Sequence, residues 1–184
     1  LFRSQFYLAN PVEILYVWRG GMSFHGGLIG VILISIYFSK IKNLKLLIFT
    51  DLLAVITPIG LFLGRIANFI NSELIGSPSN LPWSVIFVKI DQIPRHPSQL
   101  YEAILEGLVL FLILNLVFKI KKTTGFVSAS FLIFYSCFRI FVEQFRLPDE
   151  HLGYIYGLFS MGTILSLFML SLGLVLLVNV KNNK

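Results

Sequence analysis

Residues 46–76 read LLIFTDLLAVITPIGLFLGRIANFINSELIG, an apolar run that continues into arginine, asparagine and glutamate. About 20 consecutive apolar residues in a helix are enough to cross the hydrocarbon core of a bilayer. Ionisable groups at membrane depth are costly, and by default they indicate a functional site. Because it contains Pro58, Gly60 and Gly64, the segment predicts a membrane-spanning helix that is kinked or broken near its outer end and whose last turns carry site residues beginning with Arg65.

The composition of the whole chain is typical of a helical membrane protein. Its 184 residues are 56% hydrophobic and 13% charged, and the mean hydropathy is +0.82. A soluble domain of this size is far less apolar. Five segments approach the spanning length, without the alternation of a membrane barrel: 22–39, 46–70, 98–118, 125–142 and 155–180. We predict an all-α, polytopic transmembrane helical bundle, a single domain over 1–184 with an interfacial segment at 1–21 and irregular outer loops.

Lysines and arginines separate to opposite predicted sides of the membrane. Of nine lysines, all but Lys89 fall on one side, whereas the six arginines lie on or near the other. Positively charged loops are enriched on the cytoplasmic side, so we expect the lysine clusters and the C-terminus there. Basic loops on the cytoplasmic side account for the net charge of +6, so we expect no nucleic-acid partner.

Several common chemistries are not indicated by the sequence. Cys137 lies within an apolar run, and we interpret it as a small buried hydrophobe rather than a nucleophile. The three histidines lack the H-E-x-x-H spacing of zinc peptidases, and no G-x-S-x-G segment is present. We expect no metal and no cofactor. The sequence begins at Leu1 rather than methionine, and we expect it to lack the natural N-terminus.

Polar residues of four spans fall at one predicted depth. At about 1.5 Å per helical residue, they lie about 22 to 30 Å from the nearest lysine cluster: His25, Arg65, Gln99 and Arg139. Arg139, Glu143 and Arg146 form one stripe at i, i+4 and i+7 of a helix. An ion-pair staple is the alternative to a site, because buried ions must be paired whatever their purpose. Asn68 and Asn71 suit interhelical hydrogen bonds equally well.

Four blocks of the sequence, in the same order, resemble the prolipoprotein diacylglyceryl transferase family. The signature-like block is Gly64-Arg65-x-Ala67-Asn68-Phe69-x-Asn71-x-Glu73-x-x-Gly76, and the others are 25–30 (HGGLIG), 96–102 (HPSQLYE) and 139–149 with Arg139, Glu143 and Arg146. Members of this family have seven spans. The resemblance therefore implies that the five spans here correspond to the later part of that fold.

The resemblance implies an enzyme of the bacterial inner membrane whose active site lies toward the outer leaflet. It would transfer the diacylglyceryl group of phosphatidylglycerol to the lipobox cysteine of a prolipoprotein signal peptide, forming a thioether. Membrane lipids and the signal peptide are the implied partners. On this basis catalysis is assigned to His25, Arg65 and Arg139. Substrate binding is assigned to Arg65, Asn68, Asn71, Glu73, Gly76, His96, Tyr101, Glu143 and Arg146.

The chemistry of these residues is compatible with that reaction. Guanidiniums suit a phosphate leaving group, and an imidazole suits activation of a thiol that the substrate itself supplies. His96 or a water molecule is an alternative base to His25. For Tyr101 and Glu102 the alternative to a direct role is that they orient neighbouring side chains. A transporter or scramblase of anionic lipids would also need arginines at a broken helix, but apart from Asp51 and Glu106 the inner halves of the spans are apolar. A non-catalytic membrane subunit is the other alternative.

Overall fold

The computed structural model covers most of the chain. It describes residues 10, 12, 24–121, 123–147, 154–155 and 159–182, and only the backbone of Phe24, His25, Tyr154, Ile155 and Phe159. The predicted interfacial segment 1–21 lies outside the described residues apart from two positions, and it stays a prediction.

The chain divides into two compact units, Leu1–Phe49 and Thr50–Lys184. The first contains helix α2, Phe24–Lys42, where a span over 22–39 is predicted. Asn43 ends this helix in a left-handed conformation with φ of 49°. The N–H of Asn43 donates to the carbonyl of Lys40 at 3.3 Å, and that of Leu44 to Ser39 at 3.0 Å. This pair of bonds satisfies carbonyls that the end of a helix leaves without partners.

Helix α3, Leu46–Asn71, begins at the end of the first unit and continues into the second. It runs through Pro58 and to Asn71 without a break, so of the two predicted alternatives, a kinked or a broken helix, the broken one is excluded. The elements that follow along the second unit are β1 (Val85–Ile86), β2 (Pro94–Arg95), α4 (Ser98–Glu102), the π-helix η3 (Ala103–Val109), α5 (Leu110–Ile120), α6 (Phe126–Glu143), β3 (Tyr154–Ile155), β4 (Phe159–Ser160) and α7 (Met161–Asn182).

Four helical stretches among the described residues are long and apolar enough to cross a membrane. They are Leu46–Asn71, Ser98–Ile120, Phe126–Glu143 and Met161–Asn182. The predicted all-α, polytopic fold is therefore confirmed. The predicted start of the last span at 155 is wrong, because 154–155 and 159–160 pair as antiparallel strands. Helix α7 begins after Ser160, whose side chain accepts the N–H of Thr163 at 3.1 Å and so caps the helix.

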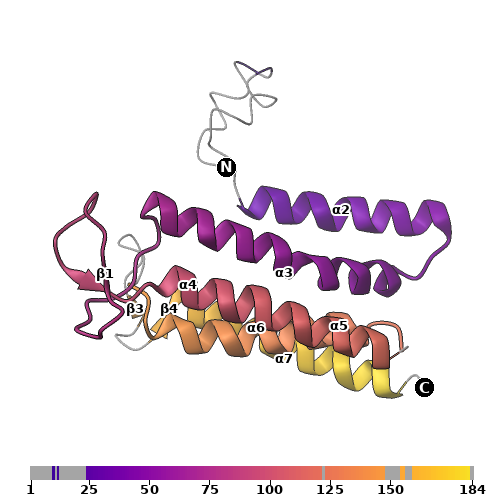
Figure 1. Ribbon diagram of the computed structural model, residues 1–184. Helices are drawn as coiled ribbons and strands as arrows, with labels where there is room; N and C mark the ends of the chain where they lie inside the picture. The colour runs from indigo at the N-terminus through magenta and orange to yellow at the C-terminus, as the bar shows by residue number, and fades with distance from the viewer. Residues whose placement is uncertain are drawn as a thin grey trace. The chain divides into compact units, whose positions relative to one another are not determined.

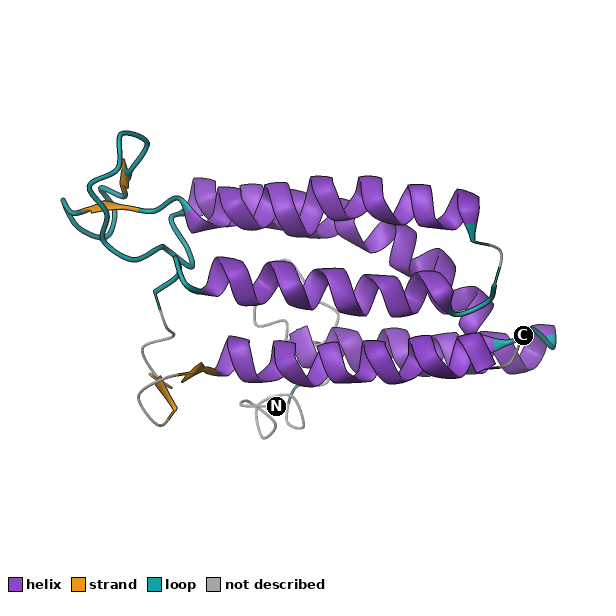
Figure 2. Cartoon of the chain, turned by 90° about the horizontal axis from the view of Figure 1, so that it is seen from below, coloured by secondary structure: helices purple, strands orange, loops and turns teal. Residues whose placement is uncertain are grey.

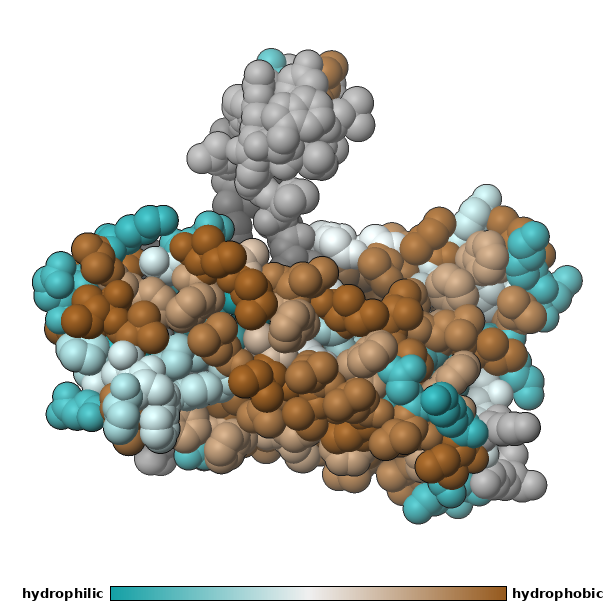
Figure 3. Space-filling model, in the orientation of Figure 1, coloured by the Kyte–Doolittle hydropathy of each residue, from teal (hydrophilic) through white to brown (hydrophobic). Residues whose placement is uncertain are grey.

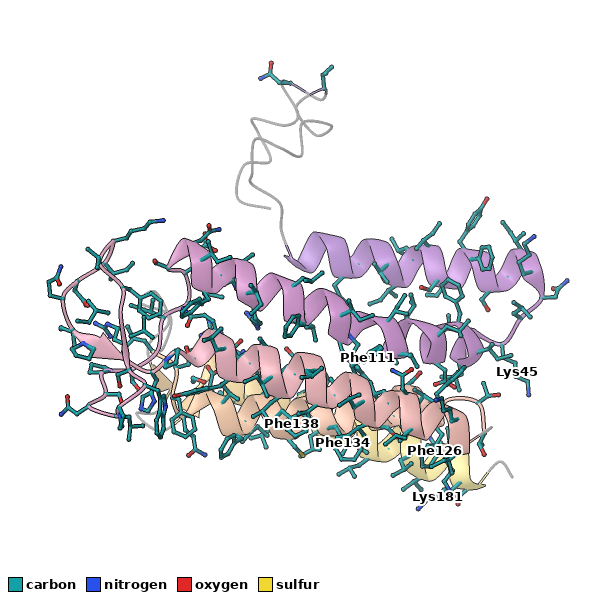
Figure 4. All side chains as sticks on the ribbon, in the orientation of Figure 1. Lys45, Phe111, Phe126, Phe134, Phe138 and Lys181 are labelled. Atoms are coloured by element: carbon teal, nitrogen blue, oxygen red, sulfur yellow. The ribbon has the colours of Figure 1, made fainter. Side chains whose placement is uncertain are left out.

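The elements α4, η3 and α5 follow one another in a single helical stretch that runs beside α6 and α7, and the short strands lie at one end of these helices (Figures 1 and 2). We call this the strand end. The opposite end carries Lys119, Lys121 and Lys181, of which Lys181 is labelled in Figure 4, and we call it the lysine end. At the strand end β1 pairs with β2 in antiparallel register, Val85 opposite Arg95. Gly76, beyond the end of α3, makes a backbone bridge with Arg146, beyond the end of α6.

The core of the second unit is small, and most large apolar side chains face outward. Ala54, Leu110, Leu114 and Val127 form the buried cluster between α3, α5 and α6. Figure 3 shows hydrophobic residues covering the helices, with hydrophilic residues toward the two ends. An apolar surface this extensive is typical of contact with lipid rather than water. Cys137 is exposed on α6, so its interpretation as a buried residue is wrong.

Helix α3 and the π-helix η3 approach each other closely at Gly107. A Cβ at this position would lie 2.7 Å from Cβ of Phe62, so only glycine fits without a shift. Small residues permit such approaches between membrane helices. The π-helical turn is also a feature that is frequent at functional sites. The close contact brings the last third of α3 against the segment that carries Glu102 and Glu106.

Candidate active site

Two arginines from different helices meet at one carboxylate. Nε of Arg65, on α3, lies 2.7 Å from Oε2 of Glu102, on α4. Nη1 of Arg139, on α6, lies 2.6 Å from the same oxygen. The structure thus brings together two of the three residues that the sequence assigns to catalysis. It does so through Glu102, which the sequence analysis considered only as an orienting group.

Two further carboxylates complete this group, which we call the arginine–glutamate cluster (Arg65, Glu102, Glu106, Arg139 and Glu143). Glu106 lies 3.7 Å from Nη2 of Arg65 and 3.5 Å from Nη1 of Arg139. Glu143 lies 2.9 Å from Nη2 of Arg139, one helical turn along α6. Glu102 and Glu106 are fully buried and Arg139 is 8% exposed. The cluster therefore concentrates five ionisable groups in the interior of a membrane protein, where unpaired charge is very costly.

The pairing within the arginine–glutamate cluster is incomplete. Two guanidiniums face three carboxylates, and Oε1 of Glu102 is buried without a hydrogen-bond partner. Oε1 of the neighbouring Gln99 is likewise buried without one. Each guanidinium has five N–H donors, more than its carboxylate contacts employ. The guanidiniums therefore have N–H groups left over that can donate to a further polar group.

The residues after Arg65 form an irregular turn rather than a continuation of α3. Ser72 and Leu74 have positive φ values of 61° and 53°, a sparsely populated conformation for such residues. The carbonyl of Asn68 accepts the N–H of Glu73 at 2.9 Å, and the carbonyl of Glu73 accepts Nε2 of Gln99 at 2.6 Å. Asn71 and Glu73 are exposed, whereas Asn68 is half-buried. The turn places their side chains at the strand end beyond Arg65.

Gly76 lies where three backbone segments cross. A Cβ added there would lie 2.1 Å from the carbonyl oxygen of His96 and 2.9 Å from that of Phe145. The carbonyl of Gly76 accepts Nη1 of Arg95 at 3.2 Å. Arg146, on the other side of the bridge, is buried and lies outside α6, so the predicted stripe of three on one helix ends at Glu143. Glycine is required here by the close approach of the backbone.

His96 and Tyr101 belong to an aromatic group at the strand end. The hydroxyl of Tyr101 lies 3.3 Å from Nδ1 of His96 and accepts Nε1–H of Trp83 at 2.8 Å. The rings of both residues pack edge-on against Phe145. Because Tyr101 directly precedes Glu102 in α4, this group lies next to the arginine–glutamate cluster along the chain.

The third residue assigned to catalysis, His25, lies in the first turn of α2, within the first unit, and its side chain lies outside what the structure describes. Its assignment stays a prediction. Within the described ranges no three His, Cys, Asp or Glu side chains are arranged to hold a metal ion.

Sequence reasoning did not assign Glu102, Glu106 or Ser160 to the site. A usable signal was present, because Glu102 and Glu106 are spaced by one helical turn within an apolar span. Buried carboxylates need cationic partners, and the arginines at the strand end were the available ones. Ser160 gave no signal of this kind, since serine is common in membrane helices for packing alone.

The fold and the cluster define a polytopic helical membrane protein with a buried guanidinium–carboxylate site. A family profile described as prolipoprotein diacylglyceryl transferase matches residues 1–179. The chain belongs to this family.

Curated relatives of the chain cover nearly all of it. The phosphatidylglycerol--prolipoprotein diacylglyceryl transferase of Geobacter sulfurreducens is 48% identical over 183 residues, which are 100% of this chain and 70% of the relative. The enzyme of the same name from Rickettsia bellii is 53% identical over 182 residues, 97% of this chain and 69% of the relative. That from Bordetella avium is 49% identical over 178 residues, 96% of this chain and 67% of the relative.

Proposed function

We propose that this protein transfers the diacylglyceryl group of phosphatidylglycerol to the lipobox cysteine thiol of a prolipoprotein, the first step of lipoprotein maturation. The observation that carries the proposal is the convergence of Arg65 and Arg139 on Glu102, in a chain that belongs to this transferase family. Two guanidiniums held by separate helices in a buried site suit a phosphate diester, which is the reacting group of phosphatidylglycerol.

The reaction replaces a carbon–oxygen bond of the lipid with a carbon–sulfur bond and moves the proton of the thiol to a base. The sulfur of the thiol bonds to the glyceryl carbon, and the bond between that carbon and the phosphate oxygen breaks. Glycerol phosphate leaves with the electron pair, so its phosphate gains a negative charge during the step. The proton of the thiol passes to a base. Stabilisation of charge that develops in the transition state is usually a large part of catalysis.

Arg65 and Arg139 are the groups that would bind this developing charge. Their existing ion pairs orient both guanidiniums before the substrate binds, which lowers the cost of reorganisation. His25 is the proposed base, because an imidazole with an ordinary pKa near 6.5 can accept the proton of a thiol with a pKa near 8.5. Asn68, Asn71 and Glu73 are proposed to hold the substrate at the strand end.

A transport function has less support from the structure. Transport of an anionic lipid needs polar groups along a continuous path, and Asp51 is the polar candidate near the lysine end. Its carboxylate accepts hydrogen bonds from the N–H groups of Gly125 and Ser128, at 2.6 and 2.7 Å. That carboxylate is already engaged in capping α6 and is 7% exposed.

We further propose that the protein lies in the bacterial inner membrane, with the strand end toward the outer leaflet and the C-terminus in the cytoplasm. The gathering of Lys119, Lys121 and Lys181 at the lysine end supports this orientation, because basic residues favour the cytoplasmic surface. The signal peptide with its lipobox cysteine would then reach the site from the strand end.

Mass spectrometry of a lipobox peptide tests the proposal. The peptide is incubated with the purified protein and phosphatidylglycerol, and a mass gain of one diacylglyceryl unit is expected. A peptide with serine in place of the lipobox cysteine is the control and should gain nothing. Binding of phosphatidylglycerol without any thioether product would instead favour a non-catalytic membrane subunit.

A further inference from the structure

Glu143 is held on two sides by residues of different helices. One of its oxygens, Oε2, lies 2.9 Å from Nη2 of Arg139 on the same helix. The other, Oε1, accepts the hydroxyl of Ser160 at 2.7 Å. Ser160 precedes α7, so this contact links the start of α7 to the arginine–glutamate cluster on α6. The carboxylate of Glu143 is thus also held by Ser160 at the start of α7, a helix that contributes no charged residue to the cluster.

The hydroxyl of Ser160 has its proton directed toward Glu143 by its other contacts. Its oxygen accepts the N–H of Thr163 at 3.1 Å, which is the capping bond of α7. It also lies 3.1 Å from Oγ1 of Thr163. A serine hydroxyl has one proton and two acceptor sites, so the single proton is available for the carboxylate while the oxygen caps the helix.

Gly162 closes the remaining side of Glu143. A Cβ at Gly162 would lie 2.5 Å from Oε1 and 2.8 Å from Cδ of Glu143. Any side chain at this position therefore displaces the carboxylate or the helix. Gly173, three turns along α7, provides a comparison, since a Cβ there would lie 2.9 Å from both Ile133 and Leu132. Both glycines permit close packing of α7 on α6, but Gly162 alone of the two contacts the cluster.

We propose that Ser160 and Gly162 are positioning residues that fix Glu143 and, through it, the guanidinium of Arg139. The inference rests on the proposed function, because it concerns the same site. Arg139 contacts Glu102 and Glu106 through Nη1 and Glu143 through Nη2, so these carboxylates together orient its guanidinium. A shift of Glu143 removes the contact on Nη2 and frees that side of the guanidinium to turn. The expected consequence is a lower kcat, since Arg139 acts on charge that develops during the reaction.

Four variants test this inference in the transfer assay with the lipobox peptide. S160A removes the proton donor, and we expect kcat/KM to fall about tenfold, chiefly through kcat. S160T keeps the hydroxyl and the cap, and it should restore most of that loss. G162A should lower kcat/KM by about tenfold or more, because its methyl group displaces Glu143. G173A, the matched control, should lower the melting temperature while its kcat per folded molecule stays at the wild-type value.

Two results would overturn the inference. One is wild-type kcat for S160A at an equal folded fraction, and the other is an equal loss of kcat in G162A and G173A, which would leave helix packing as the only role. Wild-type product formation in the same assay tests the proposed function separately. If the wild type forms no thioether, the proposed function fails and the inference that rests on it fails with it.

Discussion

Two buried carboxylate sites, one near each end of the second unit, have opposite patterns of pairing. At the lysine end, Oδ1 of Asp51 accepts the N–H and the hydroxyl of Ser128 at 2.7 and 2.6 Å, and Oδ2 accepts the N–H of Gly125 at 2.6 Å. At the strand end, Glu102 shares Oε2 between two arginines while Oε1 has no hydrogen-bond partner. Both carboxylates are buried, but only that of Asp51 has both oxygens hydrogen-bonded.

The difference distinguishes a structural site from the proposed active site. Asp51 uses the free N–H groups and the positive end of the dipole at the start of α6, so its charge is compensated by fixed backbone atoms. The arginine–glutamate cluster is compensated by side chains from several helices, and Oε1 of Glu102 has no hydrogen-bond partner. Buried polar groups that lack partners are costly in a purely structural setting. The comparison therefore predicts that changes at the strand end affect turnover and changes at the lysine end affect stability.

The largest effect is expected for Arg139→Lys. Lysine keeps the positive charge but loses the planar fork that contacts Glu102 and Glu143 together. We expect kcat/KM to fall about 100-fold to 1,000-fold, as for loss of a group that stabilises transition-state charge. Transfer kinetics measure this, and Lys119→Arg at the lysine end is the control that should leave them unchanged. Near-normal turnover of Arg139→Lys would remove the argument for phosphate binding by the guanidinium pair.

Asp51→Ala tests the other half of the comparison. It removes the acceptor of three hydrogen bonds and leaves the start of α6 without its cap. We expect the free energy of unfolding to fall by about 3 kcal/mol, with kcat per folded molecule retained. Thermal unfolding in detergent, together with turnover at a temperature well below the transition, measures both quantities. A loss of turnover without a change in melting temperature would contradict the assignment of Asp51 to stability.

Gly107→Ala is expected to have an intermediate effect on stability. The added methyl group would lie 2.7 Å from Cβ of Phe62 on α3, and overpacking of this kind costs about 1–3 kcal/mol. Gly60→Ala is the matched control, because a Cβ at Gly60 has no atom within 4 Å. That control should keep or raise the melting temperature, since alanine favours a helix over glycine by about 1 kcal/mol. Equal melting temperatures for the two variants would show that η3 does not require glycine where it contacts Phe62 of α3.

The smallest effect is expected for Asp91→Asn in the loop between β1 and β2. Hydrogen bonds from Arg95, and to a lesser extent from the N–H of Ile93, lower the pKa of Asp91 below its ordinary value of 3.8. A lowered pKa in the folded state stabilises the protein above the ordinary value, and this contribution is lost as the pH falls through the lowered pKa. The wild type should therefore melt slightly above Asp91→Asn at neutral pH, and the gap should close below about pH 4. A gap that persists in acid would exclude the Asp91 charge as its cause.

The convergence of Arg65 and Arg139 was predictable from the sequence, whereas the direction in which other side chains face was not. Counting residues placed Arg65 and Arg139 at one level, and the structure brings them to one carboxylate. Counting residues could not show that Glu102 contacts both arginines. A residue's position along a helix does not reveal whether its side chain faces the helix bundle or the lipid. Cys137 illustrates the same limit. Its apolar neighbours suggested burial, but lipid-facing surfaces are as apolar as interiors.

The start of α7 shows a second limit. The apolar pattern continues upstream of the helix, so hydropathy alone extended the span to residue 155. The capping bond from Thr163 to Ser160 and the pairing of β3 with β4 decide the boundary instead. The capping bond and the strand pairing are contacts between individual groups. Hydropathy averaged over many residues does not detect such contacts.

The sequence by itself determined the membrane-spanning helical class and the family, because these follow from run lengths, residue types and local blocks. Only the tertiary structure decided which carboxylates serve which arginines, that Asp51 caps another helix, and that Ser160 and Gly162 enclose Glu143. The physical reason is that such contacts join residues distant in the chain at separations near 3 Å. They depend on the rotation and packing of whole helices, which no single segment specifies.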